Sequence, residues 1–357
     1  MTPHHRVNAF CTAYGLRLPI LMAPMAGASP PALAVAVARA GGMGACGALS
    51  MDAAQIHAWA EHVRTQTNGT FQINTWIPDP APVRDRAQEA QLRAFLGQWG
   101  PDVPPEAGDA PLADFEAQCA AMLTAGPSVI SSIMGLYPAA FVTAMKERGI
   151  RWFATVTTVA EARAAEDAGA DAVIAQGAEA GGHRGSFDAE NAEAGMVGSF
   201  ALIPAVADAV SLPVIATGGI ADGRGVAAAL VLGASAVQIG TALLCTPEAA
   251  IPASWAEAIG RTAPEETVPT RAFSGRLARA IRTPYTIAAA AQDSPLPAPY
   301  PTQRALTGPL RREAQAANDP ARMQMWAGQS AALTRPDDAE RMVSALWKSA
   351  ESFLGQG

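Results

Sequence analysis

One histidine lies in a glycine-rich loop directly after a predicted strand. His183 belongs to the segment QGAEAGGHRG (176–185), whereas the other four histidines lie near the N-terminus or on a predicted surface helix. Imidazole titrates near neutral pH, so it suits proton transfer or the binding of an anionic substrate. We therefore predict that His183 is catalytic, with a structural loop histidine as the alternative. For Glu179 and Arg184 in the same segment, we expect an ion pair or solvated loop charges.

Two further glycine-rich turns favour a phosphate site. The segment GGIADG (218–223) follows one predicted strand, and QIGT (238–241) ends the next. Glycines let backbone N–H groups approach an anion closely, and a helix that begins near Gly223 would add the positive end of its dipole. Thr241 can donate a hydroxyl hydrogen bond. The alternative is that these glycines only make tight turns between strands and helices.

The end of the first predicted strand offers a surface for a flat ring. The segment APMAG (23–27) combines backbone atoms with the soft side chain of Met25, on which a heteroaromatic ring could rest. Packing at the end of the strand is the alternative. The GxGxxG match at 42–47 is not interpreted as a dinucleotide site. It follows a predicted helix and enters a strand, whereas the dinucleotide fingerprint follows a strand and opens a helix.

Motifs of other reaction classes are absent from the sequence. It has no GxSxG nucleophile elbow, no Walker lysine motif, no HExxH and no paired carboxylates at a recognisable spacing. Its cysteines are far apart and form no zinc-type spacing; they are Cys11, Cys46, Cys119 and Cys245. We therefore expect no metal site and a reducing compartment.

A repeated unit must position these loops. Four segments contain an Ala-rich helical run, then Gly, then a short apolar run, as in EDAGADAVIAQG (166–177). Glycine past a helix end permits a sharp turn, and apolar strands without polar alternation are typical of a parallel sheet covered on both faces. The pattern predicts strands at residues 20–23, 44–47, 71–74, 129–132, 152–156, 172–176, 214–217 and 236–240.

Eight such units predict an α/β fold of the (β/α)8 TIM-barrel type, whose active site lies at the loops after the strands. A doubly wound sheet is the alternative. Helices are expected at 31–40, 53–64, 138–148, 159–168, 200–209 and 223–232. We interpret residues 1–357 as one barrel domain with a Pro-rich helical insertion at about 78–127. A C-terminal extension, at about 248–357, would cap the barrel mouth or cover its side.

The composition excludes several kinds of partner. Charged residues make up 16% of the chain, below the roughly 25% usual for soluble domains, and the net charge is −7. No basic cluster with interleaved aromatic residues could follow a nucleic-acid backbone. The uncharged stretch 225–247 is interpreted as a buried helix and strand, because glycine and polar residues interrupt it too often for a membrane span. The N-terminus has no signal-peptide pattern, so we expect a cytoplasmic protein.

The motifs together resemble the nitronate monooxygenase family, formerly called 2-nitropropane dioxygenases. The matching segments are PILMAPMAG (19–27), the strand that ends in Asn74, AQGAEAGGHRG (175–185), PVIATGGIADGRGVAAALVLGASAVQIGT (213–241) and FSGRLARAI (273–281). The resemblance covers roughly residues 16–285. It implies a TIM-barrel flavoenzyme with noncovalently bound FMN. The implied reaction oxidises an alkyl nitronate, such as propionate 3-nitronate, with O2 to an aldehyde or ketone plus nitrite.

The resemblance also implies roles for individual residues. His183 matches the active-site histidine, which would attract the anion when protonated or take the α-proton of a nitroalkane when neutral. Ala23 and Met25 would lie beside the isoalloxazine ring of the flavin. The implied phosphate loop consists of Gln238, Ile239, Gly240 and Thr241. The other implied flavin contacts are Asn74, Gln176, Gly181, Gly182, Gly218 and Gly219.

Two other functions stay open. An NAD(P)H-dependent FMN reductase, acting on an enoyl thioester or a quinone, would share the barrel and the cofactor. A lyase or isomerase with a phosphorylated ligand would use the same glycine loops without redox chemistry. In the main interpretation the partners are a nitronate or nitroalkane and O2. A homodimer is the candidate assembly, and neither nucleic acid nor a membrane is involved.

Overall fold

Eight parallel strands form the centre of the computed structural model, which describes residues 2–355. They are β1 (Ile20–Met22), β2 (Gly44–Gly47), β3 (Phe71–Trp76), β4 (Val129–Ile133), β5 (Arg151–Val156), β6 (Ala172–Gln176), β8 (Val214–Thr217) and β9 (Ala236–Ile239). The sheet order is β1-β9-β8-β6-β5-β4-β3-β2. Hydrogen bonds from Met22 N–H to Met43 O (2.9 Å) and from Met43 N–H to Ile20 O (3.1 Å) join its two edges. The predicted (β/α)8 barrel is confirmed, and a doubly wound sheet is excluded.

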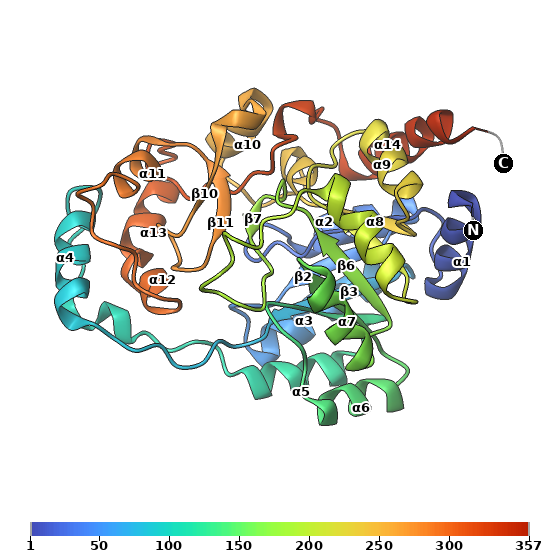
Figure 1. Cartoon of the computed structure of the whole chain (residues 1–357), viewed down its shortest axis with the longest axis horizontal. Helices are drawn as coiled ribbons and strands as arrows, with labels where there is room; N and C mark the ends of the chain where they lie inside the picture. The colour runs from blue at the N-terminus through green and yellow to red at the C-terminus, as the bar shows by residue number, and fades with distance from the viewer. Residues whose placement is uncertain (1, 356–357) are drawn as a thin grey trace.

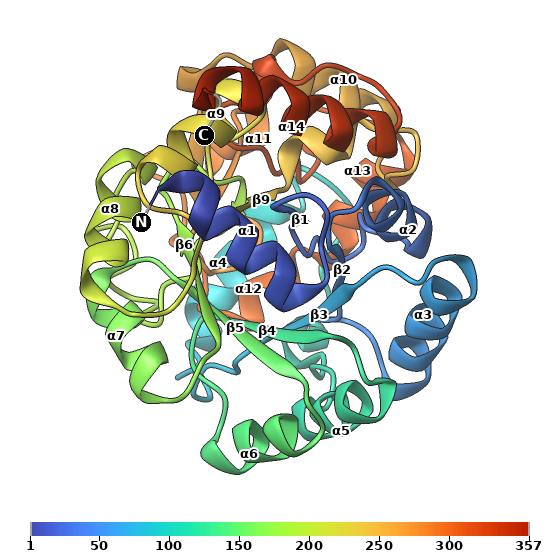
Figure 2. The ribbon, with the colours of Figure 1, turned by 90° about the vertical axis from the view of Figure 1, so that its right-hand side faces the viewer.

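Eight helices surround this barrel, and the last of them comes from the far end of the chain. Seven alternate with the strands: α2 (Pro31–Ala40), α3 (Ala53–Gln66), α5 (Phe115–Ala125), α6 (Ala139–Glu147), α7 (Val159–Asp167), α8 (Ser199–Ala209) and α9 (Gly223–Val231). The eighth, α14 (Ala339–Leu354), packs between α9 and α2 (Figure 2). Its Val343 and Leu346 join the apolar core of the barrel. The C-terminal helix therefore completes the ring.

Local sequence signals explain where these elements begin and end. Gly41 ends α2 with a φ of +103°, a conformation that glycine adopts without strain. Asp52 begins α3 with a capping box, in which its carboxylate accepts from the N–H of Gln55 and the Gln55 side chain accepts from the N–H of Asp52. The uncharged stretch 225–247 forms part of α9, then β9 and a 3-10 helix, η2 (Thr241–Cys245), as predicted.

The end of the barrel at the start of the strands is closed by a helix that the sequence pattern did not predict. Helix α1 (Pro3–Tyr14) lies across this end (Figure 2). The ring centroids of Phe10 and Tyr14 lie 6.3 and 4.9 Å from that of Phe153 on β5. A site must therefore lie at the opposite end, where the strands finish.

A lobe beyond the carboxyl ends of the strands combines two segments that are distant in sequence. Its helices are α4 (Arg86–Leu96), η1 (Pro105–Asp109), α11 (Pro284–Ala289), α12 (Thr302–Leu306) and α13 (Gly308–Ala316). The lobe lies at the opposite end of the molecule from α1 (Figure 1). Leu92 and Leu96 from α4 share an apolar cluster with Phe273, Tyr285 and Leu310. The segment 78–127 thus contributes α4 to this lobe, whereas its second helix, α5, packs against α3 beside the barrel.

A small antiparallel sheet joins this lobe to the barrel. Its strands are β7 (Gly182–His183), β10 (Thr267–Thr270) and β11 (Ala278–Ile281), in the order β10-β11-β7. His183 is paired with Ala278 on β11. The remaining helices are α10 (Ala253–Arg261), η3 (Pro264–Glu266) and η4 (Ala331–Leu333). None of these strands was predicted, and β7 places the candidate catalytic histidine on a fixed backbone.

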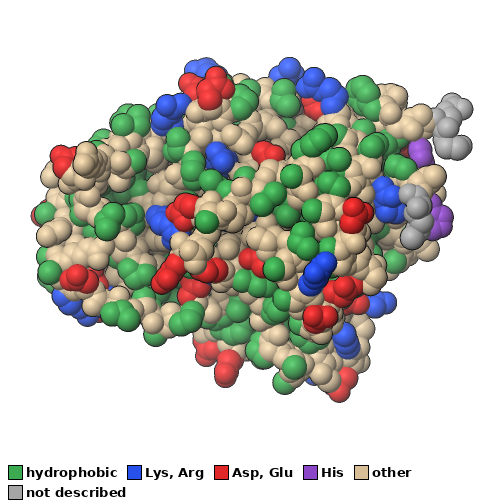
Figure 3. Space-filling model, viewed as in Figure 1, with side chains coloured by type: hydrophobic (Ala, Val, Ile, Leu, Met, Phe, Trp, Pro, Cys, Tyr) green, Lys and Arg blue, Asp and Glu red, His purple; other side chains and the backbone are tan. Residues whose placement is uncertain are grey.

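On the face shown in Figure 3, acidic and basic side chains are interspersed among uncharged ones. Among residues 2–355, no helix combines the length and the apolar character that crossing a bilayer requires.

Candidate active site

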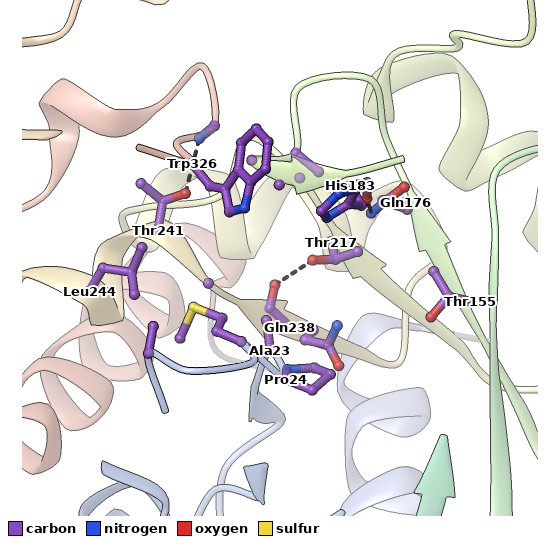
Figure 4. Close-up of a pocket in the computed structure, with 18 of the residues that line it drawn as sticks. Ala23, Pro24, Thr155, Gln176, His183, Thr217, Gln238, Thr241, Leu244 and Trp326 are labelled. Atoms are coloured by element: carbon purple, nitrogen blue, oxygen red, sulfur yellow. Dashed lines mark hydrogen bonds between the residues drawn. The ribbon is translucent and has the colours of Figure 1, made fainter. Parts of the chain in front are cut away.

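A cavity lies at the carboxyl ends of the barrel strands, and nearly all predicted site residues line it (Figure 4). Those that do are Ala23, Met25, Asn74, Gln176, Gly181, Gly182, His183, Gly218, Gly219, Gln238, Gly240 and Thr241. Ile239 is the exception, because its side chain is buried in β9 away from the cavity lining. The structure therefore brings together loops from five barrel strands and β7.

His183 lies between two indole rings. The centroid of its imidazole is 4.6 Å from that of Trp76 and 5.0 Å from that of Trp326, both at steep interplanar angles. Gln176 fixes the loop from both sides, since its Nε2 donates to the carbonyl of His183 (3.0 Å) and its Oε1 accepts from the N–H of Gly185 (2.7 Å). The side chain of Gln176 is thus a support for the histidine loop.

The surroundings of His183 disfavour a charged imidazole. Burial lowers its pKa to about 3, and the positive charges of Arg276, Arg304 and Arg311 lower it further in the same direction. Its Nε2 lies 2.8 Å from the hydroxyl oxygen of Ser274. Of the two protonation states that the sequence left open, the structure favours the neutral one.

The arginines near His183 leave a net positive field on this side of the cavity. Arg276 is buried and forms an ion pair with Asp79. Arg304 and Arg311 form no ion pair within residues 2–355; Arg311 instead donates to Thr307 Oγ1 (3.1 Å) and to other neutral acceptors. The field that opposes an imidazolium also favours an anion placed beside the neutral imidazole.

The opposite side of the cavity is built mostly from backbone. Gly218 and Gly219 follow β8 with φ values of +103° and +73°, and within residues 2–355 their N–H groups make no hydrogen bond. Two contacts from the tail hold this side. Thr241 Oγ1 accepts from the N–H of Gly328 (3.0 Å), and the Ser330 hydroxyl donates to the carbonyl of Gly219 (2.6 Å). Consecutive glycines with open N–H groups are suited to an anionic group.

The N–H groups at the start of α9, the helix expected to assist this anion site, already have an acceptor. The carboxylate of Asp222 accepts from the N–H groups of Arg224 (3.0 Å) and Gly225 (3.2 Å) at the start of α9. A capping carboxylate satisfies these donors and repels a second anion. The start of α9 is therefore capped by the chain itself, and the donors left open for an anion are those of the glycine backbone and Thr241.

Two amide side chains present free polar groups to the cavity. Gln72, buried beneath it, donates to Gln238 Oε1 (3.2 Å), so the Gln238 amide keeps its N–H donors for a ligand. Asn74 donates to the carbonyl and the hydroxyl of Ser131 (both 3.1 Å), which leaves its oxygen as an acceptor. A cavity with one donor and one acceptor on its floor suits a heteroaromatic ring with polar edges.

Glu179 and Arg184 form neither an ion pair with each other nor solvated loop charges. The Glu179 carboxylate accepts from the N–H and the hydroxyl of Ser199 (2.9 Å each) at the start of α8. Arg184 is 6% exposed and donates to the carbonyls of Gln176 (2.5 Å) and Gly195 (3.0 Å). Both expectations were wrong because the charged groups are used to hold the loop.

Several residues of the site were missed by the sequence analysis. They are Trp76, Ser274, Trp326, Gly328 and Ser330. Trp76 lies two residues beyond Asn74 on β3, at the spacing that puts side chains on one face of a strand, so alternation along the strand could have indicated it. The segment 326–330 had no local signal of its own. Among residues 2–355, no cluster of His, Cys, Asp and Glu suited to a metal ion is found.

The fold and the site define a (β/α)8-barrel enzyme with a histidine at the mouth of the barrel and a glycine-lined wall opposite. The chain belongs to the nitronate monooxygenase family, whose model matches residues 9–349. It is 39% identical to a nitronate monooxygenase from Paraburkholderia phytofirmans, over 100% of this chain and 98% of the relative. It is 38% identical to one from Pseudomonas aeruginosa, over 95% of this chain and 98% of the relative.

Solved structures agree with this placement. The chain is similar to the nitroalkane oxidase from Streptomyces ansochromogenes, with a TM-score of 0.86, 35% identity, and coverage of 95% of this chain and 98% of the other. It is also similar to FabK from Thermotoga maritima, with a TM-score of 0.76, 29% identity, and coverage of 97% and 96%. The barrel with its added lobe is therefore shared across full-length structures.

Proposed function

We propose that this protein oxidises alkyl nitronates, such as propionate 3-nitronate, with O2 to an aldehyde or ketone plus nitrite. One observation carries the substrate class: a neutral His183 lies in a field of arginine charges, two of which form no ion pair within residues 2–355. A nitronate is an anion, and this field favours it over a neutral substrate. Membership of the nitronate monooxygenase family supports the same assignment.

We propose FMN as the cofactor. Gly218 and Gly219 offer unpaired N–H groups for its phosphate, with the Thr241 hydroxyl beside them. The polar edge of its ring would meet the amides of Asn74 and Gln238. Met25 and Ala23, which line the same cavity, would lie beside the ring. When bound, FMN supplies the redox chemistry of the reaction.

The remaining task of the protein is to bind and orient the substrate. The positive field draws the nitronate towards His183, and the indoles of Trp76 and Trp326 restrict water on either side of the imidazole. With a neutral nitroalkane, the neutral imidazole would accept the α-proton and leave the electron pair on the substrate as the nitronate. Binding a nitronate and accepting a proton from a nitroalkane both require the substrate to lie beside the His183 imidazole.

The test begins with the colour of the purified protein. We expect flavin absorption, release of FMN on denaturation, and O2 uptake with nitrite formation on addition of propionate 3-nitronate. A colourless protein without flavin would sink the proposal. It would favour a lyase or isomerase with a phosphorylated ligand.

An NAD(P)H-dependent reductase is the second candidate. An enoyl reductase domain from Bacillus amyloliquefaciens shares the fold, with a TM-score of 0.64 at 13% identity, so the barrel itself is compatible with that activity. Mixing the protein with NADH without oxygen decides between them. Rapid bleaching of the flavin, without nitrite formation from nitronate in air, would assign it to the reductases.

We also propose that the protein works in the cytoplasm, because all four cysteines are free and three of them are buried. A homodimer stays a prediction, which light scattering can test.

A further inference from the structure

The two ring nitrogens of His183 have different surroundings. Nε2 lies 2.8 Å from the Ser274 hydroxyl oxygen, and that oxygen also lies 3.2 Å from the carbonyl of Arg276. Nδ1 makes no hydrogen bond within residues 2–355, and it is absent from the polar atoms that are sealed from solvent without a partner. Because His183 lines the cavity, Nδ1 is the nitrogen open to a ligand.

The Arg276 carbonyl offers the Ser274 hydroxyl an acceptor other than His183. A hydroxyl carries one hydrogen, and a carbonyl can only accept. If the hydrogen of Ser274 is donated to Arg276, its oxygen must accept from Nε2–H of His183. We propose that Ser274 is a positioning residue that holds His183 as the Nε2-protonated neutral tautomer, with the Nδ1 lone pair presented to the substrate.

The surrounding loop keeps Ser274 in place. Ser274 is 2% exposed. The next residue, Gly275, has a φ of +85°, and a Cβ there would lie 2.4 Å from the carbonyl oxygen of Ala298. On the other side, the carbonyl of Phe273 accepts from Thr307 Oγ1 (2.6 Å). The backbone that carries the Ser274 side chain is therefore held on both sides.

This tautomer gives Nδ1 one defined task, which rests on the proposed function. With a neutral nitroalkane, the α C–H bond breaks, its proton goes to Nδ1, and its electron pair stays on the substrate as the nitronate. Throughout this step, Nε2–H continues to donate its hydrogen bond to Ser274 Oγ, which stabilises the imidazolium that forms. With the opposite tautomer, Nδ1 would carry a hydrogen and could not accept the proton.

The test is direct observation of the tautomer by nitrogen NMR on flavin-loaded protein labelled with 15N-histidine. The His183→Asn variant identifies the resonances of His183. We expect only the Nε2-protonated pattern in the wild type and a mixture of tautomers in Ser274→Ala. The pattern should be restored in Ser274→Thr, which keeps a hydroxyl. A wild type with hydrogen on Nδ1 would overturn the proposal, and this result requires no variant to fold.

Kinetics provide the second readout. With nitroethane as substrate, Ser274→Ala should lower kcat about tenfold with little change in KM. This is less than the roughly 10²-fold that a proton-transfer group itself contributes, because Ser274 acts through His183. Ser186→Ala is the matched control, because Ser186 is also buried and donates to a backbone carbonyl, that of Asp188. Unchanged turnover and tautomer in Ser274→Ala would refute the role. If the wild type fails to oxidise nitronates, the proposed function fails, while the NMR result still decides the role of Ser274.

Discussion

The cavity has two sides that are built in different ways. The side after β8 and β9 is formed by the backbone of Gly218, Gly219 and Gly240. Its N–H groups can bind a ligand without any side chain. The side around His183 uses bulky side chains, Trp76 and Trp326, that come from β3 and from the tail. The first side can hold an invariant group such as a phosphate, whereas the second sets protonation and substrate choice.

The two sides also carry different kinds of charge. The glycine side offers partial positive charges from peptide dipoles, which do not titrate. The histidine side combines full arginine charges with an imidazole whose pKa they depress. Substitutions on the two sides should therefore affect different measurements, and the following predictions test that separation.

The largest effect is expected on the histidine side. His183→Asn should leave FMN bound and lower turnover with propionate 3-nitronate by about 10²-fold or more, a typical contribution of a positioned proton-transfer group. Flavin absorption and nitrite formation measure the two properties in one preparation. Unchanged turnover would show that the imidazole has no part in the reaction.

The glycine side should respond in cofactor affinity instead. Gly219→Ala places a Cβ 3.1 Å from Glu179 Cβ at a φ of +73°, so we expect FMN to bind roughly tenfold more weakly, equivalent to about 1.4 kcal/mol. Gly149→Ala is the matched control. Its φ is +68° and nothing lies within 4 Å of the added Cβ, so the backbone strain is similar but the cavity is distant. Equal FMN affinity in both variants would contradict the phosphate assignment.

The depressed pKa of His183 predicts a pH dependence of stability. The pKa is about 3 in the folded protein, against 6.5 for an unperturbed histidine. Within this window the unfolded chain binds more protons, so the free energy of unfolding falls as the pH is lowered, by up to about 1.4 kcal/mol per pH unit from this group. Urea unfolding at several pH values gives the free energy of unfolding as a function of pH. The slope of this dependence should be shallower for His183→Asn than for the wild type. Equal slopes would mean that His183 titrates normally.

The smallest effect concerns the unpaired arginines. Arg304→Gln removes one charge near His183, so KM for propionate 3-nitronate should rise about fivefold, the equivalent of roughly 1 kcal/mol of screened attraction, with little change in kcat. The difference should shrink at high salt. Arg312→Gln, an exposed change on the neighbouring α13, is the control and should leave KM unchanged. An equal effect of both variants would show that only the overall charge matters.

The barrel was predictable because its signals are local. Helix, glycine and apolar strand repeat along the chain, and the strand bounds from residue 214 to 217 agree with β8 residue for residue. The glycines after β8 and the loop around His183 were found for the same reason. Beyond that range the sequence did not show which residues come together, even for Ser274 within the matching segment 273–281. Ser274 lies 91 positions from His183, and Trp326 follows a proline-rich stretch without clear periodicity.

The sequence by itself determined that strands end in glycine loops at one end of a barrel, since turn geometry and apolar periodicity act over a few residues. Only the tertiary structure decided the state of His183. Its pKa depends on burial and on three arginines at positions 276, 304 and 311, and its hydrogen bond depends on a loop that β11 brings beside β7. Electrostatic fields act through space, so their sources cannot be read from the order of residues along the chain.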